Sequence, residues 1–198
     1  MDTRVLLLLF FLPCMLMAQE SFSQDEKREY EQSIKKQGVP AEILDSLEPF
    51  LQKASRIKYY FQTDGEEESY EIKGRMKRKY YSVEYQKDGT LIDIEMLIDF
   101  EEIPEDARSS ISEYLQEKYD KYVFTRLQQQ YYPQEKDAEE ALEDFMEEDF
   151  EDFDIRYELE VDTRSNNRLG SFELLFDTEG KYMQDRKIVR RAEDNIFY

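Results

Sequence analysis

Clustered carboxylates are the side chains of this sequence with the clearest capacity for chemistry. Twelve acidic residues and a single lysine lie between Glu135 and Asp154. Carboxylate oxygens are preferred ligands of Ca²⁺, although the spacing lacks the glycine turn and alternating ligands of an EF-hand loop. A solvated amphipathic helix, or a site for a basic partner, explains the same segment. The acids that could capture Ca²⁺ are Glu147, Glu148, Asp149, Glu151 and Asp152.

Most other catalytic chemistry has no support in the composition. The chain has no histidine and one cysteine, Cys14, which argues against His-based acid–base catalysis, cysteine nucleophiles and the usual zinc sites. Ser33 and Lys36 match the Ser-x-x-Lys spacing of some acyl enzymes, but companion motifs are absent. The sequence therefore predicts a protein that is not an enzyme and needs no cofactor.

The charge of the chain restricts its partners. Asp and Glu number 47 against 27 Lys and Arg, which gives a formal net charge of −20. Such a surface repels phosphate backbones, so nucleic acid is not expected as a partner. Basic proteins, basic peptides and divalent cations remain open.

The first eighteen residues have the pattern of an export signal. Arg4 supplies a charged start, Val5 to Met17 is almost entirely apolar, and Ala18 is a small residue before Gln19. No later segment approaches the ~20 apolar residues that a membrane helix needs. We expect cleavage near Ala18 and a mature periplasmic or extracellular protein without a membrane span.

A sequence match indicates an internal repeat. Tyr81 to Gly89 and Phe172 to Gly180 share alternating apolar residues and a closing glycine, and Val39-Pro40 matches Ile103-Pro104 upstream. Repeats of this kind are typical of tandem structural units. The predicted fold class is α+β, a tandem repeat of a helix plus a four-stranded antiparallel sheet, with an extra N-terminal helix.

Local patterns place the elements of each unit. The capping-box spacing of Ser23 and Glu26 predicts the N-terminal helix at about 24–37. Helical spacing predicts helices at 40–55 and 104–119. Alternation predicts eight strands, near 57–63, 70–77, 79–86, 90–98, 122–132, 155–162, 171–177 and 181–189. The expected organisation is a signal peptide over 1–18, an N-terminal helix within 19–38, a first unit over 39–102, and a second unit over 103–198 with an acidic helical insertion at 135–154.

One face of the first sheet carries charges of both signs. Basic residues lie on one strand and acidic residues on its neighbours: Lys73, Arg75 and Lys77, and Glu84, Asp93 and Glu95. Such cross-strand pairs are typical of a solvated sheet face. The alternative is a docking surface, because Tyr and Arg are enriched at binding hot spots. The partner-binding residues predicted on that basis are Tyr60, Arg75, Tyr80 and Arg126.

Several motifs resemble a known family. Tyr70-Glu-Ile-Lys73, the hairpin from Val83 to Gly89, Arg126 to Tyr131, and the ending Asp194 to Tyr198 are similar to segments of the PepSY-like proteins of Bacteroidetes, also described as β-lactamase-inhibitor-like. The resemblance covers roughly 39–198. It implies a secreted, non-catalytic protein with a curved sheet backed by helices. Inhibitor-like relatives use such a concave face to bind another protein.

The expected function combines these inferences. We expect an exported, non-catalytic binding protein, inhibitor-like in form, that engages an envelope or secreted protein or a peptide through its sheet face. The alternative is an acidic envelope protein that binds calcium.

Overall fold

The fold is a single curved sheet that nearly closes on itself. A computed structural model describes residues 26–134 and 137–189, so the predicted signal peptide and its cleavage site lie outside the described residues. The strands are β1 (Glu26–Lys27), β2 (Glu29–Ile34), β3 (Ser55–Asp64), β4 (Glu67–Met76), β5 (Lys79–Gln86), β6 (Leu91–Leu97), β7 (Lys121–Pro133), β8 (Phe153–Ser165), β9 (Arg168–Phe176) and β10 (Tyr182–Ile188).

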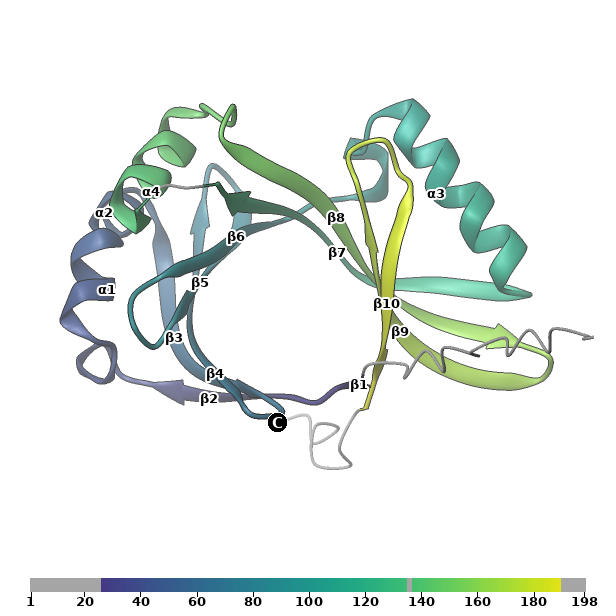
Figure 1. The fold of residues 1–198 in the computed structure, drawn as a ribbon, viewed down its shortest axis with the longest axis horizontal. Helices are drawn as coiled ribbons and strands as arrows, with labels where there is room; N and C mark the ends of the chain where they lie inside the picture. The colour runs from purple at the N-terminus through teal and green to yellow at the C-terminus, as the bar shows by residue number, and fades with distance from the viewer. Residues whose placement is uncertain (1–25, 135–136, 190–198) are drawn as a thin grey trace, which may run out of the picture.

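In the described part of the chain, four α-helices are present, and they lie outside the curved sheet (Figure 1). They are α1 (Ala41–Ser46), α2 (Glu48–Lys53), α3 (Glu105–Lys118) and α4 (Ala138–Glu147), with short 3₁₀ turns at Lys36–Gly38 and Phe100–Glu102. α4 lies within the predicted acidic insertion and packs against α1 and α2. No helix in the described ranges has the length and apolar character that a membrane crossing requires.

The N-terminal segment joins the two ends of the sheet. The strand order is β1-β10-β9-β8-β7-β6-β5-β4-β3-β2. β1 pairs in parallel with β10, and β2, which follows immediately, pairs antiparallel with β3. Residues 26–34, which we call the strap, therefore complete a barrel-like ring, seen along its bottom edge in Figure 1.

The predicted tandem repeat of a helix plus a four-stranded sheet is wrong. β6 pairs with β7, with Ile94 opposite Tyr131, so strands from both predicted units belong to one ten-stranded sheet. The repeated sequences form the ends of two hairpins in this sheet, β5–β6 and β9–β10. The sequence repeat is a match between two short segments. The pairing of β6 with β7, which joins the two halves of the chain, depends on contacts that a short sequence pattern cannot predict.

The predicted N-terminal helix is also wrong. Residues 29–34 form β2, which pairs with β3 from Glu29 opposite Asp64 to Ile34 opposite Tyr59. The capping-box spacing at Ser23 predicts a helix, but Lys27, Glu29 and Glu31 also alternate as strand residues do. Pairing with an open sheet edge satisfies a row of backbone groups, which outweighs a marginal helix preference.

The two faces of the sheet have opposite character. The outer face is apolar and packs beneath the helices: Ile72, Val83 and Tyr85 lie under α1, α2 and α4, and Leu159 and Phe176 lie under α3. Because successive side chains of a strand point to opposite faces, the inner face receives the charged and polar residues. The interior of the ring is consequently polar.

Candidate functional site

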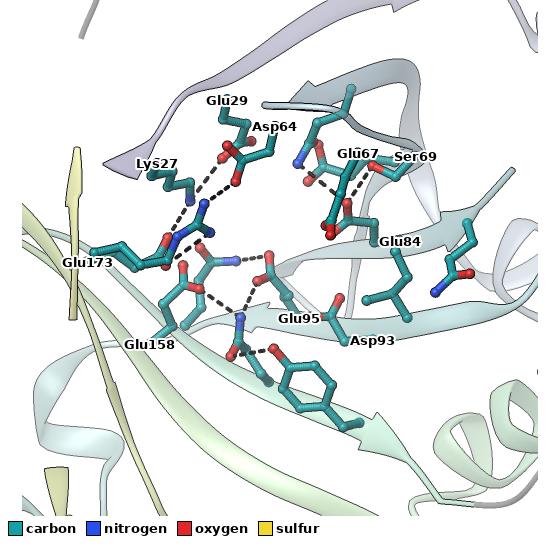
Figure 2. A pocket seen from close by; sticks show the side chains of 18 of the residues that line it. Lys27, Glu29, Asp64, Glu67, Ser69, Glu84, Asp93, Glu95, Glu158 and Glu173 are labelled. Carbon is teal, nitrogen blue, oxygen red and sulfur yellow. Dashed lines mark hydrogen bonds and ion pairs between the residues drawn. The ribbon is translucent and has the colours of Figure 1, made fainter. Parts of the chain in front are cut away.

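The inner face of the ring encloses an acidic cavity of about 650 Å³, which we call the acidic chamber (Figure 2). Its basic residues are Lys27, Lys87, Arg126 and Arg186. Its acidic residues outnumber them and come from β2 to β6, β8, β9 and the turns between them: Glu29, Asp64, Glu67, Glu68, Glu71, Glu84, Asp88, Asp93, Glu95, Glu158 and Glu173. The chamber is therefore a concentration of negative charge inside the fold.

One side of the acidic chamber is neutralised by the chain itself. Lys27 Nζ lies 2.6 Å from Glu173 Oε2 and 2.9 Å from Glu29 Oε2. Arg186 forms an ion pair with Asp64 and lies 3.7 Å from a Glu173 oxygen. These ion pairs connect the strap, β3, β9 and β10, so they also stabilise the ring at the position where it closes.

Replacing Lys27 tests this fastening. We expect Lys27→Met to lower the free energy of unfolding by about 2 kcal/mol, because removing one partner of a largely buried ion pair leaves carboxylates uncompensated, although Arg186 remains near Glu173. Thermal melts measure the change. Lys87→Met is the control, because the Lys87–Glu68 pair is solvent-exposed and such pairs contribute about 0–1 kcal/mol. Equal losses of unfolding free energy in Lys27→Met and Lys87→Met would contradict a role for Lys27 in stabilising the closure of the ring.

The other side of the acidic chamber is held by hydrogen bonds without cations. Glu84 accepts a 2.6 Å hydrogen bond from the Ser69 hydroxyl. The Gln130 side-chain amide donates to Glu95 and Glu158, at 2.8 Å each. None of these three glutamates forms an ion pair with a described residue.

Asp93 is the least satisfied of these acids. It is 3% exposed, and its Oδ1 is buried without a hydrogen-bond partner among the described residues. Burial, followed by the charges of Glu95 and Glu84, raises the pKa of Asp93 well above its ordinary value. Burial likewise raises the pKa of Glu158 and brings that of Glu84 to about 7. At least part of this side of the chamber is therefore protonated near neutral pH.

A second cavity of about 900 Å³ adjoins the chamber, and we call it the cationic groove. It shares Glu95, Arg126 and Gln128 with the chamber. Its basic residues are Arg56, Lys58, Lys73 and Arg126, against the acids Glu95 and Glu160, and its large apolar or aromatic residues include Tyr60, Tyr80, Tyr81 and Leu97. The groove is a local excess of positive charge on a strongly acidic protein.

The structure brings the predicted partner-binding residues together. Tyr60, Tyr80 and Arg126 line the cationic groove. Arg75 lies opposite Tyr80 in the β4–β5 ladder, with its guanidinium carbon 5.6 Å from the centre of the Tyr80 ring. Lys73 Nζ lies 5.0 Å from the centre of the Tyr60 ring. Cation–π contacts at these distances order long side chains, so the groove is partly preorganised.

Irregular pairing marks both walls of the cationic groove. The β3–β4 register shifts between Ser55 and Lys58, and the β7–β8 register shifts between Phe124 and Arg126. Arg56, inside the first irregularity, has a left-handed φ of 57°, which is uncommon for a residue with a side chain. Bulges redirect side chains and are frequent next to binding sites.

The predicted calcium residues lie elsewhere, at the end of α4 and in the loop that follows it. They are exposed, and Glu148 forms an ion pair with Lys77 instead of a carboxylate cluster. Within the described ranges, no group of three or more acidic residues has a geometry that could hold a metal ion. Calcium binding stays a prediction, which a calcium-dependent melting temperature would test.

The acidic chamber is the feature that sequence reasoning missed. The sequence predicts a solvated sheet face for Glu84, Asp93 and Glu95, with the basic residues of β4 as their cross-strand partners. Asp93 is buried, and Lys77 lies in an exposed turn. One pattern in the sequence could have predicted the chamber. On several strands the charged residues lie on the face opposite the apolar residues, and in a closed sheet with an apolar outer face these charged residues point inward.

The fold has relatives among solved structures. The chain is similar in fold to a BLIP-like protein and to other proteins of Bacteroides. A BLIP-like protein of Bacteroides fragilis aligns with a TM-score of 0.50 at 14% identity, over 80% of this chain and 92% of that one. A DUF2874 family protein of Bacteroides uniformis gives 0.53 at 13% identity, over 75% and 89%. A Bacteroides eggerthii protein, whose description places it in the periplasm, gives 0.53 at 11% identity, over 75% and 88%.

These likenesses concern the fold alone. No family model matches the chain, and no curated protein matches it. The predicted resemblance to β-lactamase-inhibitor-like proteins is confirmed as a BLIP-like fold. The PepSY-like part of the resemblance stays a prediction.

Proposed function

We propose that this chain is an exported, non-catalytic binding protein that engages an envelope or secreted protein, or a peptide, through the cationic groove. The observation that carries the proposal is the gathering of Tyr60, Tyr80 and Arg126 in one cavity, with Arg75 stacked on Tyr80. These residues come from four strands, so only the folded sheet assembles them.

The chemistry of the groove suits protein recognition. Tyr80 is 50% exposed and Leu97 is 40% exposed, which provides apolar surface that a partner could bury. Tyrosine and arginine are enriched among residues that dominate binding energy. Ordered side chains lose less conformational entropy on binding, and the Arg75–Tyr80 and Lys73–Tyr60 contacts provide that order.

Export and the lack of catalysis are supported by two other observations. The sequence begins with the signal-like segment over 1–18, and a protein of the same fold has a description that places it in the periplasm. The descriptions of the structural relatives name no catalytic activity. Inhibition of a partner enzyme is one form that such binding could take.

A pull-down tests the proposal. The mature chain from Gln19 is cross-linked to envelope and secreted fractions of its own organism, beside Arg75→Glu/Tyr80→Ala. We expect the native chain to capture a protein that the variant loses by about tenfold or more, as for removal of hot-spot contacts. The captured protein is identified by mass spectrometry and rebound in purified form.

The control replaces matched side chains away from the groove. Arg168→Glu/Leu169→Ala makes the same charge change and removes an exposed apolar side chain, since Leu169 is 85% exposed on β9. This control should keep the partner. Capture by the folded groove variant at native strength, or no capture by any of the three proteins, would reject the proposal.

A further inference from the structure

The two sides of the acidic chamber differ in how their charge is compensated. On the side of the strap, Lys27 and Arg186 neutralise carboxylates through ion pairs. Across the chamber, no cation of the described chain forms an ion pair with Glu84, Asp93, Glu95 or Glu158, which we call the carboxylate quartet. Arg126 is a nearby cation on the chamber wall. Burial lowers its pKa, but the charges of the surrounding acids Glu95, Glu160, Glu71 and Glu158 together raise it above the ordinary value.

Asp93 gives this side an unfilled hydrogen-bonding position. The residue is 97% buried, because only 3% of its surface is exposed, and it lines the chamber with Oδ1 unpartnered. Figure 2 shows its side chain beside Glu95 on β6, without any interaction drawn to it. An unpartnered buried polar oxygen costs about 1–3 kcal/mol. A donor that enters the chamber would recover this energy.

We propose that the carboxylate quartet binds an alkylammonium group, supplied by a lysine side chain of another protein or by a free polyamine. The site adjoins the cationic groove and shares Glu95 with it, but its other three acids line the chamber alone, so the inference goes beyond the proposed function. An ammonium group has three donors and no acceptor, which complements a set of acceptors that includes an unpartnered oxygen. Lys27 already binds two carboxylates of the same chamber in this way.

A metal ion fits the carboxylate quartet less well. Ca²⁺ needs six to eight oxygens at about 2.3–2.6 Å, and no group of described acids is arranged to hold a metal ion. The donors of an ammonium group reach acceptors at about 2.7–2.9 Å and tolerate a looser arrangement. The quartet's own hydrogen bonds from Ser69 and Gln130 keep two of its glutamates in place.

The chamber is accessible to such a group. Exposed residues line it near the β3–β4 and β5–β6 turns, where the acids Glu67, Glu68 and Asp88 outnumber Lys87, which pairs with Glu68. A negatively charged entrance raises the local concentration of cations and speeds their association. The chamber volume, about 650 Å³, is in the range of small-ligand sites.

Binding of an ammonium group should release protons from the chamber, and this release can be measured. Around Asp93 the charged groups are Glu71 on β4, Glu84 on β5, Glu95 on β6, Arg126 on β7 and Glu158 on β8, with Lys27 and Glu173 beyond them. Carboxyls that are protonated in the empty chamber must ionise to bind an ammonium group. Each proton released passes to the buffer, so the measured heat depends on the ionisation enthalpy of that buffer.

Calorimetry with defined probes tests the proposal. Trilysine, spermidine and CaCl₂ are titrated into the mature chain near neutral pH, once in PIPES and once in Tris, two buffers that differ in ionisation enthalpy. We expect trilysine or spermidine to bind, with different heats in the two buffers. Asp93→Asn/Glu158→Gln should weaken binding by about tenfold or more, the effect of losing hydrogen bonds to charged groups.

Two controls make the result specific. Glu139→Gln/Glu143→Gln removes the same charge from the exposed face of α4 and should bind as the native chain does. The groove variant Arg75→Glu/Tyr80→Ala should also bind, which separates this inference from the proposed function. The single variant Asp93→Asn is the smaller change. Its melting curve shows whether the chain is still folded, so that weaker binding cannot be attributed to misfolding.

The outcomes decide the inference. Binding of trilysine alone supports a lysine side chain as the source, and binding of spermidine alone supports a free polyamine. Equal affinity in the native and Asp93→Asn/Glu158→Gln proteins, equal heats in both buffers, no binding of either amine, or binding of Ca²⁺ in preference to the amines would each overturn it.

Discussion

The melting temperature of this protein is expected to fall as the pH rises from about 5 to about 8, by about 5–10 °C. Many proteins lose stability at acidic pH because paired carboxylates must be protonated. Here the dominant carboxyls behave in the opposite way. The acidic chamber holds them where burial and neighbouring negative charges favour the protonated form.

The direction follows from four chamber residues. Burial raises the pKa of Glu71 to about 8 and that of Glu84 to about 7, from the ordinary value of 4.5. It also raises the pKa of Asp93 and Glu158. Between the ordinary and raised values, the folded chain binds protons that the unfolded chain has released. The free energy of unfolding is therefore greatest near pH 4.5 and decreases up to about pH 8.

Carboxylates with lowered pKa values do not reverse this trend. Hydrogen bonds from Lys79 and Lys77 lower the pKa of Glu102 and Glu148, respectively. Their stabilising contribution is complete above the ordinary value and is lost only as the pH falls below it. They limit stability in strong acid, outside the window in which the chamber residues act.

Melting curves at several pH values measure the effect. Asp93→Asn/Glu158→Gln should flatten the decrease and raise the melting temperature at pH 8, because neutral amides remove charges that the fold must otherwise bury. The exposed control Glu139→Gln/Glu143→Gln should keep the native slope. A melting temperature that rises between pH 5 and pH 8 in the native chain would contradict the assignment.

Local sequence patterns predicted the strands well and the topology poorly. The eight predicted strands are all present as β3 to β10, and α3 covers most of the predicted 104–119 helix. Alternation and helical spacing are local properties of a few residues. Closure of the ring depends on β6 meeting β7 and on the strap meeting both β3 and β10, and nothing local in residues 26–34 specifies partners so distant in sequence.

The candidate sites were predicted unevenly for the same reason. Tyr60, Tyr80 and Arg126 could be selected by residue type, because Tyr and Arg are enriched at binding hot spots, and these three residues line one cavity. The burial of Asp93 and Glu158 could not be read from the chain. On an open sheet these acids would be solvated, and the closure of the ring is what removes them from water.

The second large effect concerns a glycine at the end of the sequence repeat. Gly180, in the turn between β9 and β10, has a left-handed φ of 77°. A Cβ added there would overlap the carbonyl oxygen of Ala107 and lie 2.8 Å from its carbonyl carbon. Ala107 belongs to α3 and is 2% exposed. The glycine therefore allows the turn to touch the backbone of the helix.

Neither side of this contact can easily move away. Ile111 and Leu115 of α3 are fully buried in one core cluster with Leu174 and Phe176 of β9. The turn is held by Asp177, whose carboxylate accepts hydrogen bonds from the backbone N–H groups of Glu179 and Lys181 at 3.1 and 2.7 Å. Relieving the overlap would require separating α3 from the sheet, which exposes part of that core.

We expect Gly180→Ala to lower the free energy of unfolding by about 3 kcal/mol or more, combining left-handed strain with overpacking. The matched control is Gly65→Ala, where φ is 65° and nothing lies within 4 Å of the added Cβ. Gly65→Ala introduces the left-handed strain without an overlap, so we expect it to lower the free energy of unfolding by about 1–2 kcal/mol. Denaturant unfolding measures both. The additional loss of unfolding free energy in Gly180→Ala measures the cost of the overlap between the β9–β10 turn and α3. Equal losses in the two variants would contradict the prediction, because they would show that the turn and α3 separate without loss of stability.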